Sequence, residues 1–211
     1  MKIRYTDDLF DPNTQKSTVI DFKTKRIKLE KSQENVLLSI WDTAGSEKYK
    51  SMAKIYLKNA QGILLCFDIT NRESFEELNN FWFDLINEYY NLEDNNNSVR
   101  VLYLIGTKFD LCEEDENNRV VSESDADKMA TKFNGKYFES SSKTGYNVEH
   151  IFTELAEDIY EQECLLSSEE NVNDKPRDRL TGSFKLNKSF YSTDSYDKDD
   201  VKNQSSQNKS C

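Results

Sequence analysis

The chain is poor in several residue types, and each shortage narrows its possible functions. Its 211 residues include two prolines, a single histidine (His150) and six glycines, and no glycine precedes Gly45. The single histidine leaves little room for a hydrolase with a Ser-His-Asp triad. No apolar run approaches the about 20 residues of a membrane-spanning helix, and the N-terminal stretch MKIRYTDDLF lacks the apolar core of a signal peptide.

Basic residues are outnumbered by acidic ones, and the cysteines are scattered. The net charge of −11 at pH 7 argues against a nucleic-acid partner, which would require a basic face. The cysteines are Cys66, Cys112, Cys164 and Cys211, and they match no metal-ligand spacing. Such scattered cysteines are typical of a reducing, cytosolic compartment.

Short apolar runs alternate with amphipathic stretches along most of the chain. Strands are predicted at Thr18–Leu29, Val36–Trp41, Ile63–Ile69, Val101–Gly106 and Lys136–Glu139. Helices are predicted at Ser74–Tyr90, Ser124–Phe133 and Asn147–Cys164. Ser74 and Glu77 resemble a capping box at the start of the first of these helices. The first two strands are expected to form an antiparallel hairpin and the later ones a buried parallel sheet, which together predict an α/β fold with a doubly wound sheet.

The chain changes character near residue 165. Residues 1–164 contain the predicted elements and form one domain in this interpretation. Residues 165–211 are rich in Ser, Asn, Asp and Lys, show no apolar period and carry equal numbers of basic and acidic residues. This composition predicts a disordered tail that ends at Cys211.

Three polar runs follow predicted strands in chain order. They are Trp41–Gly45 (WDTAG), Gly106–Asp110 (GTKFD) and Ser140–Lys143 (SSSK). Each run taken singly is more often a structural turn than a ligand site. Their order, and their common position after strands, where open α/β sheets bind ligands, instead indicate one guanine-nucleotide site.

The first run has residues suited to magnesium and phosphate. Asp42 ends a strand, where a carboxylate can hold a Mg²⁺-bound water against a triphosphate. Gly45 has no side chain, so its backbone N–H can come close to the γ-phosphate.

The second and third runs have residues suited to guanine. The Asp110 carboxylate can accept hydrogen bonds from the ring N–H and the exocyclic amine of guanine, a pairing that adenine cannot make. The Lys108 stem can cover one face of the base. Ser142 can offer a backbone N–H to the guanine oxygen, and Lys143 can cover the other face.

On these motifs the chain resembles Rab-type small GTPases of the Ras superfamily, from residue 1 to about residue 164. Four segments are similar to Rab-specific ones, namely Ile20–Phe22, Ile40–Gly45, Leu65–Thr70 and Asn147–Phe152. The resemblance implies a small-GTPase fold of the P-loop NTPase type, GTP and GDP as ligands, Mg²⁺ as cofactor, and a switch function in vesicle or membrane trafficking. It also implies effectors, exchange factors and GTPase-activating proteins as partners.

Further residues acquire roles only through this resemblance. Phe22, Trp41 and Tyr56 would form an exposed aromatic triad that meets effectors.

Two more roles concern the nucleotide and its metal. Phe10 resembles the aromatic residue that packs on guanine. Counting from Phe10 without a gap places Ser17 at the Mg²⁺-binding hydroxyl, whereas one gap places Thr18 there.

Two positions depart from the family pattern. Ser46 stands where the family usually has the glutamine that orients the attacking water, and its shorter side chain predicts slow hydrolysis of GTP to GDP and phosphate. Thr107 stands at the usual asparagine of the base-binding loop, and its hydroxyl can donate one hydrogen bond rather than two. Together with Leu111–Asp115, these departures look most like the atypical Rab twenty-four branch.

The phosphate-binding loop of the family, GxxxxGK[ST], has no counterpart in the printed sequence. We expect Met1 to lie near the end of the family's first helix, and the sheet to lack its first strand. This leaves a gap between Val36–Trp41 and Ile63–Ile69, and it predicts weak nucleotide binding by these residues alone. Two hypotheses remain open: a Rab GTPase whose recorded start is too late, or a pseudo-GTPase that serves as a protein-interaction module.

The C-terminus also leaves two alternatives. Rab proteins generally end in paired cysteines that carry prenyl chains, whereas Cys211 stands alone. One prenyl chain gives only marginal membrane binding, and an unmodified thiol gives none. The expected location is the cytoplasm, or the cytosolic face of an endomembrane where Cys211 is prenylated.

Overall fold

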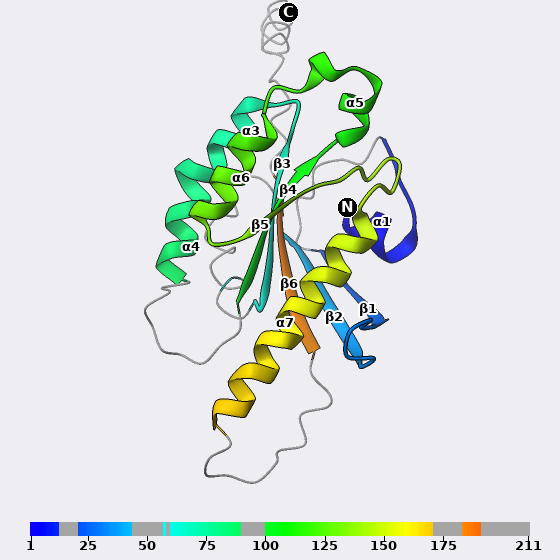
Figure 1. Ribbon diagram of the computed structural model, residues 1–211. Coiled ribbons are helices and arrows are strands. Elements are labelled where there is room, and N and C mark those ends of the chain that lie inside the picture. Colours follow the sequence, from blue (N-terminus) through cyan, green and yellow to red (C-terminus); the bar gives the residue numbers. More distant parts are fainter. Residues whose placement is uncertain (13–20, 44–56, 58–59, 90–99, 171–182, 191–211) are drawn as a thin grey trace, which may run out of the picture.

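The computed structural model describes residues 1–12, 21–43, 57, 60–89, 100–170 and 183–190, and these build a six-stranded sheet with helices on both faces (Figure 1). The strand order is β1-β2-β6-β3-β4-β5. The predicted α/β class is confirmed. None of the helices in these ranges is both long and apolar enough to cross a membrane.

Strands β1 (Asp21–Lys28) and β2 (Asn35–Thr43) form the expected antiparallel hairpin. The register pairs Phe22 with Trp41 and Asp21 with Asp42. Strand β1 lies at the edge of the sheet, and its exposure alternates along the strand, as expected for an edge strand with one face on the core.

Strands β3 (Gly62–Asp68), β4 (Val101–Thr107) and β5 (Lys136–Glu139) pair in parallel, as their sequences predict. Every residue of β3 and β4 is buried. Their side chains alternate between two apolar clusters, one on each face of the sheet.

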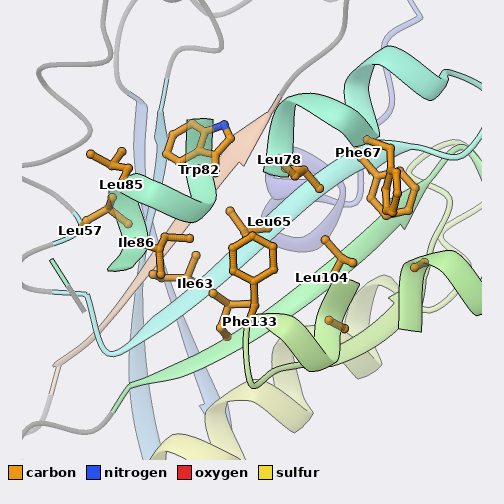
Figure 2. Packing of buried hydrophobic residues seen from close by; sticks show 14 of the residues in the cluster. Leu57, Ile63, Leu65, Phe67, Leu78, Trp82, Leu85, Ile86, Leu104 and Phe133 are labelled. Atoms are coloured by element: carbon orange, nitrogen blue, oxygen red, sulfur yellow. The ribbon is translucent and has the colours of Figure 1, made fainter. Parts of the chain in front are cut away.

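The first cluster lies under the helices that follow β3 and under α6 (Glu123–Lys132). Figure 2 shows side chains of β3, such as Leu65, packed with Leu78 and Trp82 from the helix above and with Phe133 at the end of α6. The opposite cluster lies under α1 (Lys2–Asp7) and α7 (Val148–Glu170), where Tyr5 stacks on Phe152 with ring centroids 4.0 Å apart.

The predicted helix at 74–90 is a longer, interrupted one. It consists of α3 (Arg72–Glu77), a π-helical turn η2 (Leu78–Trp82) and α4 (Phe83–Tyr89). The capping-box prediction is wrong, because Asn71 is the N-cap and its side chain accepts hydrogen bonds from the N–H groups of Glu73 and Ser74. The Ser74 hydroxyl is buried and accepts a hydrogen bond from the N–H of Asp68.

Two short helices complete the carboxyl side of β4. They are α5 (Phe109–Glu114) and the 3₁₀ turn η3 (Glu116–Asn118), neither of which was expected from the sequence. Both helices are too short for their sequences to show the repeat of apolar residues that marks a helix.

Strand β6 (Ser183–Phe190) overturns two expectations about the tail and the sheet. These residues were expected to be disordered, yet their backbone pairs in parallel with β2 on one side and β3 on the other. The expected gap between β2 and β3 is therefore filled, as the orange strand in Figure 1 shows. The physical reason is that two unpaired inner strand edges favour any segment able to pair with both.

The predicted boundary at residue 164 is also too early. Helix α7 continues to Glu170, and the tail contributes β6 to the sheet of the domain. The remaining tail residues lie outside the described ranges.

Candidate functional site

The three motifs meet at the carboxyl ends of the parallel strands. Strands β2, β3, β4 and β5 end there with Thr43, Asp68, Thr107 and Glu139. In Figure 1 this edge of β3 and β4 points toward α5. Because parallel strands present their carboxyl ends on one side, residues far apart in the chain become neighbours here.

The end of β4 and the first residue of the loop after it are both held by side-chain contacts with β3. The hydroxyl of Thr107, which is buried, donates a hydrogen bond of 2.7 Å to the carbonyl oxygen of Phe67 in β3. Lys108 has a left-handed backbone (φ 65°), and its Nζ lies 2.7 Å from Oδ2 of Asp68. Asp68 also accepts hydrogen bonds at Oδ1 from the N–H and the hydroxyl of Thr70. The single donor of Thr107 is therefore sufficient to tie this loop to the neighbouring strand.

Gly106, the residue before Thr107, lies where neighbouring side chains leave no room for a Cβ atom. A Cβ atom at this position would lie 2.6 Å from Cγ2 of Ile69 and 2.6 Å from the hydroxyl oxygen of Tyr137. Such distances are far below a van der Waals contact, so a larger residue would displace the strand end that carries Thr107.

Asp110 lies where the second and third motifs meet. The residue is 7% exposed, and its Oδ1 accepts a hydrogen bond of 2.5 Å from the hydroxyl of Ser141. Lys143 Nζ lies 3.6 Å from Oδ2 of Asp110 and 2.9 Å from Glu114. The backbones also join here, because the N–H of Phe109 donates to the carbonyl of Ser140. The structure thus brings the predicted base-binding residues together.

The third motif is supported from below by a partly buried ion pair. Arg119 binds Glu139 with both guanidinium nitrogens, at 2.6 and 2.8 Å, and the hydroxyl of Tyr137 donates to the same carboxylate. Burial raises the pKa of Glu139, but hydrogen bonds from Arg119 and Tyr137 outweigh it, so the net pKa is lowered. The carbonyl of Glu139 accepts a hydrogen bond from the side chain of Asn147. This cluster holds the start of the 140–143 loop.

Asp42 is the one residue of the predicted magnesium site that lies in the described ranges. Lys2 is 2% exposed, and its Nζ lies 3.4 Å from Oδ2 of Asp42 while it also bonds Asp21 on the neighbouring strand. The hydrogen bond from Lys2 lowers the pKa of Asp21. In this structure the Asp42 carboxylate is therefore neutralised by an ammonium group from α1.

Two of the predicted effector residues are neighbours on the surface of the hairpin. The rings of Phe22 and Trp41 lie 4.4 Å apart between centroids, in the register that pairs these residues. Phe22 is 45% exposed. Their contact makes one continuous aromatic patch, and its role toward partners stays a prediction.

Other predicted residues are not brought to the site by the described structure. Phe10 lies beyond the end of α1 and is 45% exposed. The positions outside the described ranges are Ser17, Thr18, Gly45, Ser46, Tyr56 and Cys211. Ser142 and Lys143, by contrast, are at the site, because they follow Ser141, whose hydroxyl donates a hydrogen bond to Asp110. Ser142 is half-buried and Lys143 is exposed.

Sequence reasoning missed four residues that build the site. Lys2, Asp68, Arg119 and Ser141 each bind one of the predicted residues or support its loop. A signal existed for Asp68, because it ends an apolar strand just as Asp42 does. No pattern in the sequence marks Lys2 or Arg119, since their partners lie on other elements.

The described residues fit the base of a guanine nucleotide better than its phosphates. Asp110 has acceptor capacity beyond its bond to Ser141, and the stems of Lys108 and Lys143 stand on the two loops that flank it. For the metal, no group of three or more His, Cys, Asp or Glu side chains in the described part of the chain is placed to hold an ion. Asp42 is the available carboxylate, and its expected hydroxyl partners lie outside the described ranges.

Comparison with known proteins gives a consistent result. Residues 1–161 match the Ras family. The chain is 36% identical to Ras-related protein SEC4 of Candida albicans over 170 residues, and this aligned region covers 81% of this chain and 73% of that protein. It is 35% identical over 157 residues to Ras-related protein RABE1d of Arabidopsis thaliana, with 74% and 67% covered. It is 34% identical over 166 residues to Ras-related protein Rab-18-B of Danio rerio, with 79% and 75% covered.

These relatives bear on the open alternatives. Their names give no support to the pseudo-GTPase hypothesis. They also do not single out the Rab twenty-four branch, so that narrower resemblance stays a prediction.

Proposed function

Because the chain belongs to the Ras family and is a small GTPase of the Rab type, we propose that it is a guanine-nucleotide-dependent switch in vesicle or membrane trafficking. Membership of this family implies guanine nucleotide and Mg²⁺ as ligands, and effectors and regulators as partners. The proposal assigns the base-reading function to the loops Gly106–Asp110 and Ser140–Lys143.

The observation that carries the proposal is the position of the Asp110 carboxylate. It is almost buried, it is oriented by the Ser141 hydroxyl at 2.5 Å, and it lies where two strand-end loops join. A carboxylate fixed in this way presents acceptors, which suits the two adjacent donors of guanine and does not suit adenine. Because Ser141 already orients the carboxylate, the carboxylate does not have to be reoriented when the base binds.

The remaining residues of the two loops take supporting roles. Lys108 and Lys143 cover the faces of the base with their stems, and Thr107 keeps the first loop on β3. Ser142 offers its backbone N–H to the guanine oxygen. Phe10 packs on the base from the segment after α1.

The phosphate side of the proposal rests on the resemblance. Asp42, with Thr18 or Ser17, would hold Mg²⁺, which when bound neutralises charge on the transferred phosphoryl group. Gly45 offers a backbone N–H to the γ-phosphate. Ser46 is a weak substitute for a water-orienting amide, so we expect slow intrinsic hydrolysis of GTP to GDP and phosphate.

The switch would be read out at the surface. We propose that Phe22, Trp41 and Tyr56 form the surface for effectors, because the Phe22–Trp41 contact supports a continuous aromatic patch. Exchange factors and GTPase-activating proteins would act on the same switch. The proposed location is the cytoplasm and, with prenylated Cys211, the cytosolic face of an endomembrane.

A change of base preference tests the proposal. We expect the chain to prefer GDP over ADP, and the substitution Asp110→Asn to reverse its preference between GDP and xanthosine diphosphate. The carbonyl oxygen of the Asn side chain can still accept the hydrogen bond from Ser141. Its NH₂ group, however, would face the N–H donors of guanine, and two donors cannot form a hydrogen bond. The loss of two charge-assisted hydrogen bonds changes the ratio of the two affinities by about 100-fold or more. Titration of the full chain, followed by NMR, measures weak and strong binding alike.

Asp127→Asn is the matched control. It makes the same chemical change on the exposed face of α6, away from both loops, and should leave the ratio unchanged. Equal binding of GDP and ADP by the unaltered chain, or an unchanged ratio in Asp110→Asn, would refute the assignment of Asp110 to guanine.

A further inference from the structure

Two aromatic rings join the loops that are proposed to read the base. Phe109 is the first residue of α5, and Tyr146 lies in the loop between β5 and α7. Their ring centroids are 4.7 Å apart and the ring planes differ by 21°, which is a stacked arrangement. Phe109 also packs against the apolar cluster under α6, whereas Tyr146 is 47% exposed. The contact therefore extends the apolar packing of the first loop onto the second.

The backbone of Tyr146 also closes the turn that contains Ser141. The N–H of Ser141 donates a hydrogen bond of 3.1 Å to the carbonyl oxygen of Tyr146, and the N–H of Gly145 donates one of 2.9 Å to the carbonyl oxygen of Ser141. Gly145 has a positive φ of 85°, which allows the chain to turn back at this point. The hydroxyl of Ser141 accepts a hydrogen bond of 3.1 Å from the N–H of Thr144. The turn thus holds Ser141 by both its backbone and its side chain.

These contacts form a closed circuit that includes the Asp110 carboxylate. Asp110 follows Phe109 in the chain, and Phe109 stacks on Tyr146. The backbone of Tyr146 binds that of Ser141, whose hydroxyl donates to Oδ1 of Asp110 at 2.5 Å. Hydrogen bonds weaken steeply when their direction changes, so the ability of Asp110 to pair with a base depends on how firmly this circuit holds it.

We propose that Phe109 and Tyr146 are positioning residues for guanine recognition, because their stack fixes the direction of the Asp110 carboxylate through Ser141. Neither ring has to touch the base for this role. The group of the ligand that depends on it most is the exocyclic amine of guanine, because its hydrogen bond requires both carboxylate oxygens to face the edge of the base. The inference rests on the proposed function, since it takes Asp110 to be the residue that reads guanine.

Selectivity between GDP and inosine diphosphate provides the first test. Hypoxanthine lacks the exocyclic amine, so the unaltered full chain should prefer GDP by about 10-fold or more, the value of one charge-assisted hydrogen bond. Tyr146→Ala removes the stack and should reduce this preference by about 3–10-fold, the contribution of an aromatic pair. Tyr146→Phe keeps the ring and should keep the preference. Titration of each chain, followed by NMR, measures both affinities.

Tyr160→Ala is the matched control for a general loss of stability. Tyr160 packs against the cluster under α7 and lies twelve residues after Val148, about 18 Å further along the helix. The substitution removes a ring of the same size, so it should lower stability but leave the ratio of the two affinities unchanged. An equal fall of the ratio in Tyr160→Ala and Tyr146→Ala would refute the proposal.

A double substitution tests whether the two rings act as one unit. The combination of Phe109→Ala with Tyr146→Ala should reduce the preference for GDP no further than the larger of the two single effects, because either substitution already breaks the stack. Single effects that multiply in the double variant would mean that the rings act independently, and would refute the stack as the cause.

Hydrogen exchange without nucleotide separates this inference from the proposed function. The amides of Phe109 and Ser141 should exchange about 3–10-fold faster in Tyr146→Ala than in the unaltered chain or in Tyr146→Phe. Unchanged exchange, or an unchanged preference for GDP in Tyr146→Ala, would refute the positioning role and leave the assignment of Asp110 intact. Equal binding of GDP and inosine diphosphate by the unaltered chain, together with faster exchange in Tyr146→Ala, would refute guanine reading itself and with it the inference.

Discussion

The sheet has two halves that are secured in different ways. In β3–β4–β5 each strand pairs with a strand of the same half, and the loops at its carboxyl edge bond one another directly, as Asp110 does with Ser141. In β1–β2 the two strands form a complete hairpin, and the inner edge of β2 pairs with β6, as the inner edge of β3 also does. Its candidate functional carboxylate, Asp42, depends on Lys2 of α1.

This difference separates the two parts of the candidate site. The loops proposed to bind the base are preorganised by contacts within β3–β4–β5 and its loops, so their geometry is expected to survive changes elsewhere. Asp42 instead depends on the ammonium group of Lys2 from α1, so the Asp42 side is expected to be the more easily altered one. For the proposed switch function, such a division would keep base recognition constant while the responsive part changes.

The largest effect is expected in β3–β4–β5, at the ion pair below the loop that starts at Ser140. Arg119→Met leaves the carboxylate of Glu139, whose side chain is 11% exposed, without its cation. Removing one partner of such a pair costs about 3 kcal/mol in free energy of unfolding, because the remaining charge is poorly solvated. Urea unfolding at pH 7 measures this cost. Arg72→Met is the control, since Arg72 and Asp125 form an exposed pair and its loss should not be measurable.

The effect of Arg119→Met should also depend on pH. In the unaltered chain the pKa of Glu139 is lowered, so its contribution to stability is present above about pH 4.3 and is lost as the pH falls through the lowered value. Without Arg119, burial dominates and raises this pKa, so protonation relieves the strain. The difference between the two chains should therefore shrink between pH 7 and pH 4, and a constant difference would contradict the ion-pair explanation.

A smaller effect is expected in the half that depends on α1. Lys2→Met keeps an apolar stem but leaves Asp42 and Asp21 without the buried ammonium. The expected cost is about 1–2 kcal/mol, because Asp21 is half exposed and regains water while the desolvation of Lys2 is also relieved. Thermal and urea unfolding measure the change.

The pKa of Asp21 gives a readout that a loss of packing would not move. It is lowered by the hydrogen bond from Lys2 and should return toward its usual value in Lys2→Met, as followed by carboxyl NMR. Lys128→Met on the exposed face of α6 is the control and should leave it unchanged. An unchanged pKa of Asp21 would contradict the contact.

The smallest expected effect concerns the surface of the hairpin. A double-mutant cycle of Phe22→Ala and Trp41→Ala should give a coupling of about 0.5–1 kcal/mol in the free energy of unfolding, from the aromatic contact at 4.4 Å. Phe10→Ala is the control, because Phe10 is equally exposed at 45% and should show no coupling to Trp41. A coupling of zero for Phe22 would mean that the two rings do not form one patch.

Much of the fold follows from local sequence patterns. The apolar runs predicted β3 and β4 within one residue at each end, and the period of the helices predicted α6 within one residue at each end. The helix predicted at 74–90 is present, but its π-helical interruption was missed because local periodicity does not mark a π-helical turn, and the N-cap at Asn71 was missed because the pair Ser74 and Glu77 was preferred to it.

The sequence by itself determined the family, and it predicts the residues that read the base, because both are encoded in short runs directly after strands. The tertiary structure alone decided that Ser141 orients Asp110, that Lys2 neutralises Asp42 and that Ser183–Phe190 enters the sheet. The reason is physical. A buried charge must find a partner and an inner strand edge must be paired, but either requirement can be met by any suitable group that the fold brings near, however distant in the chain.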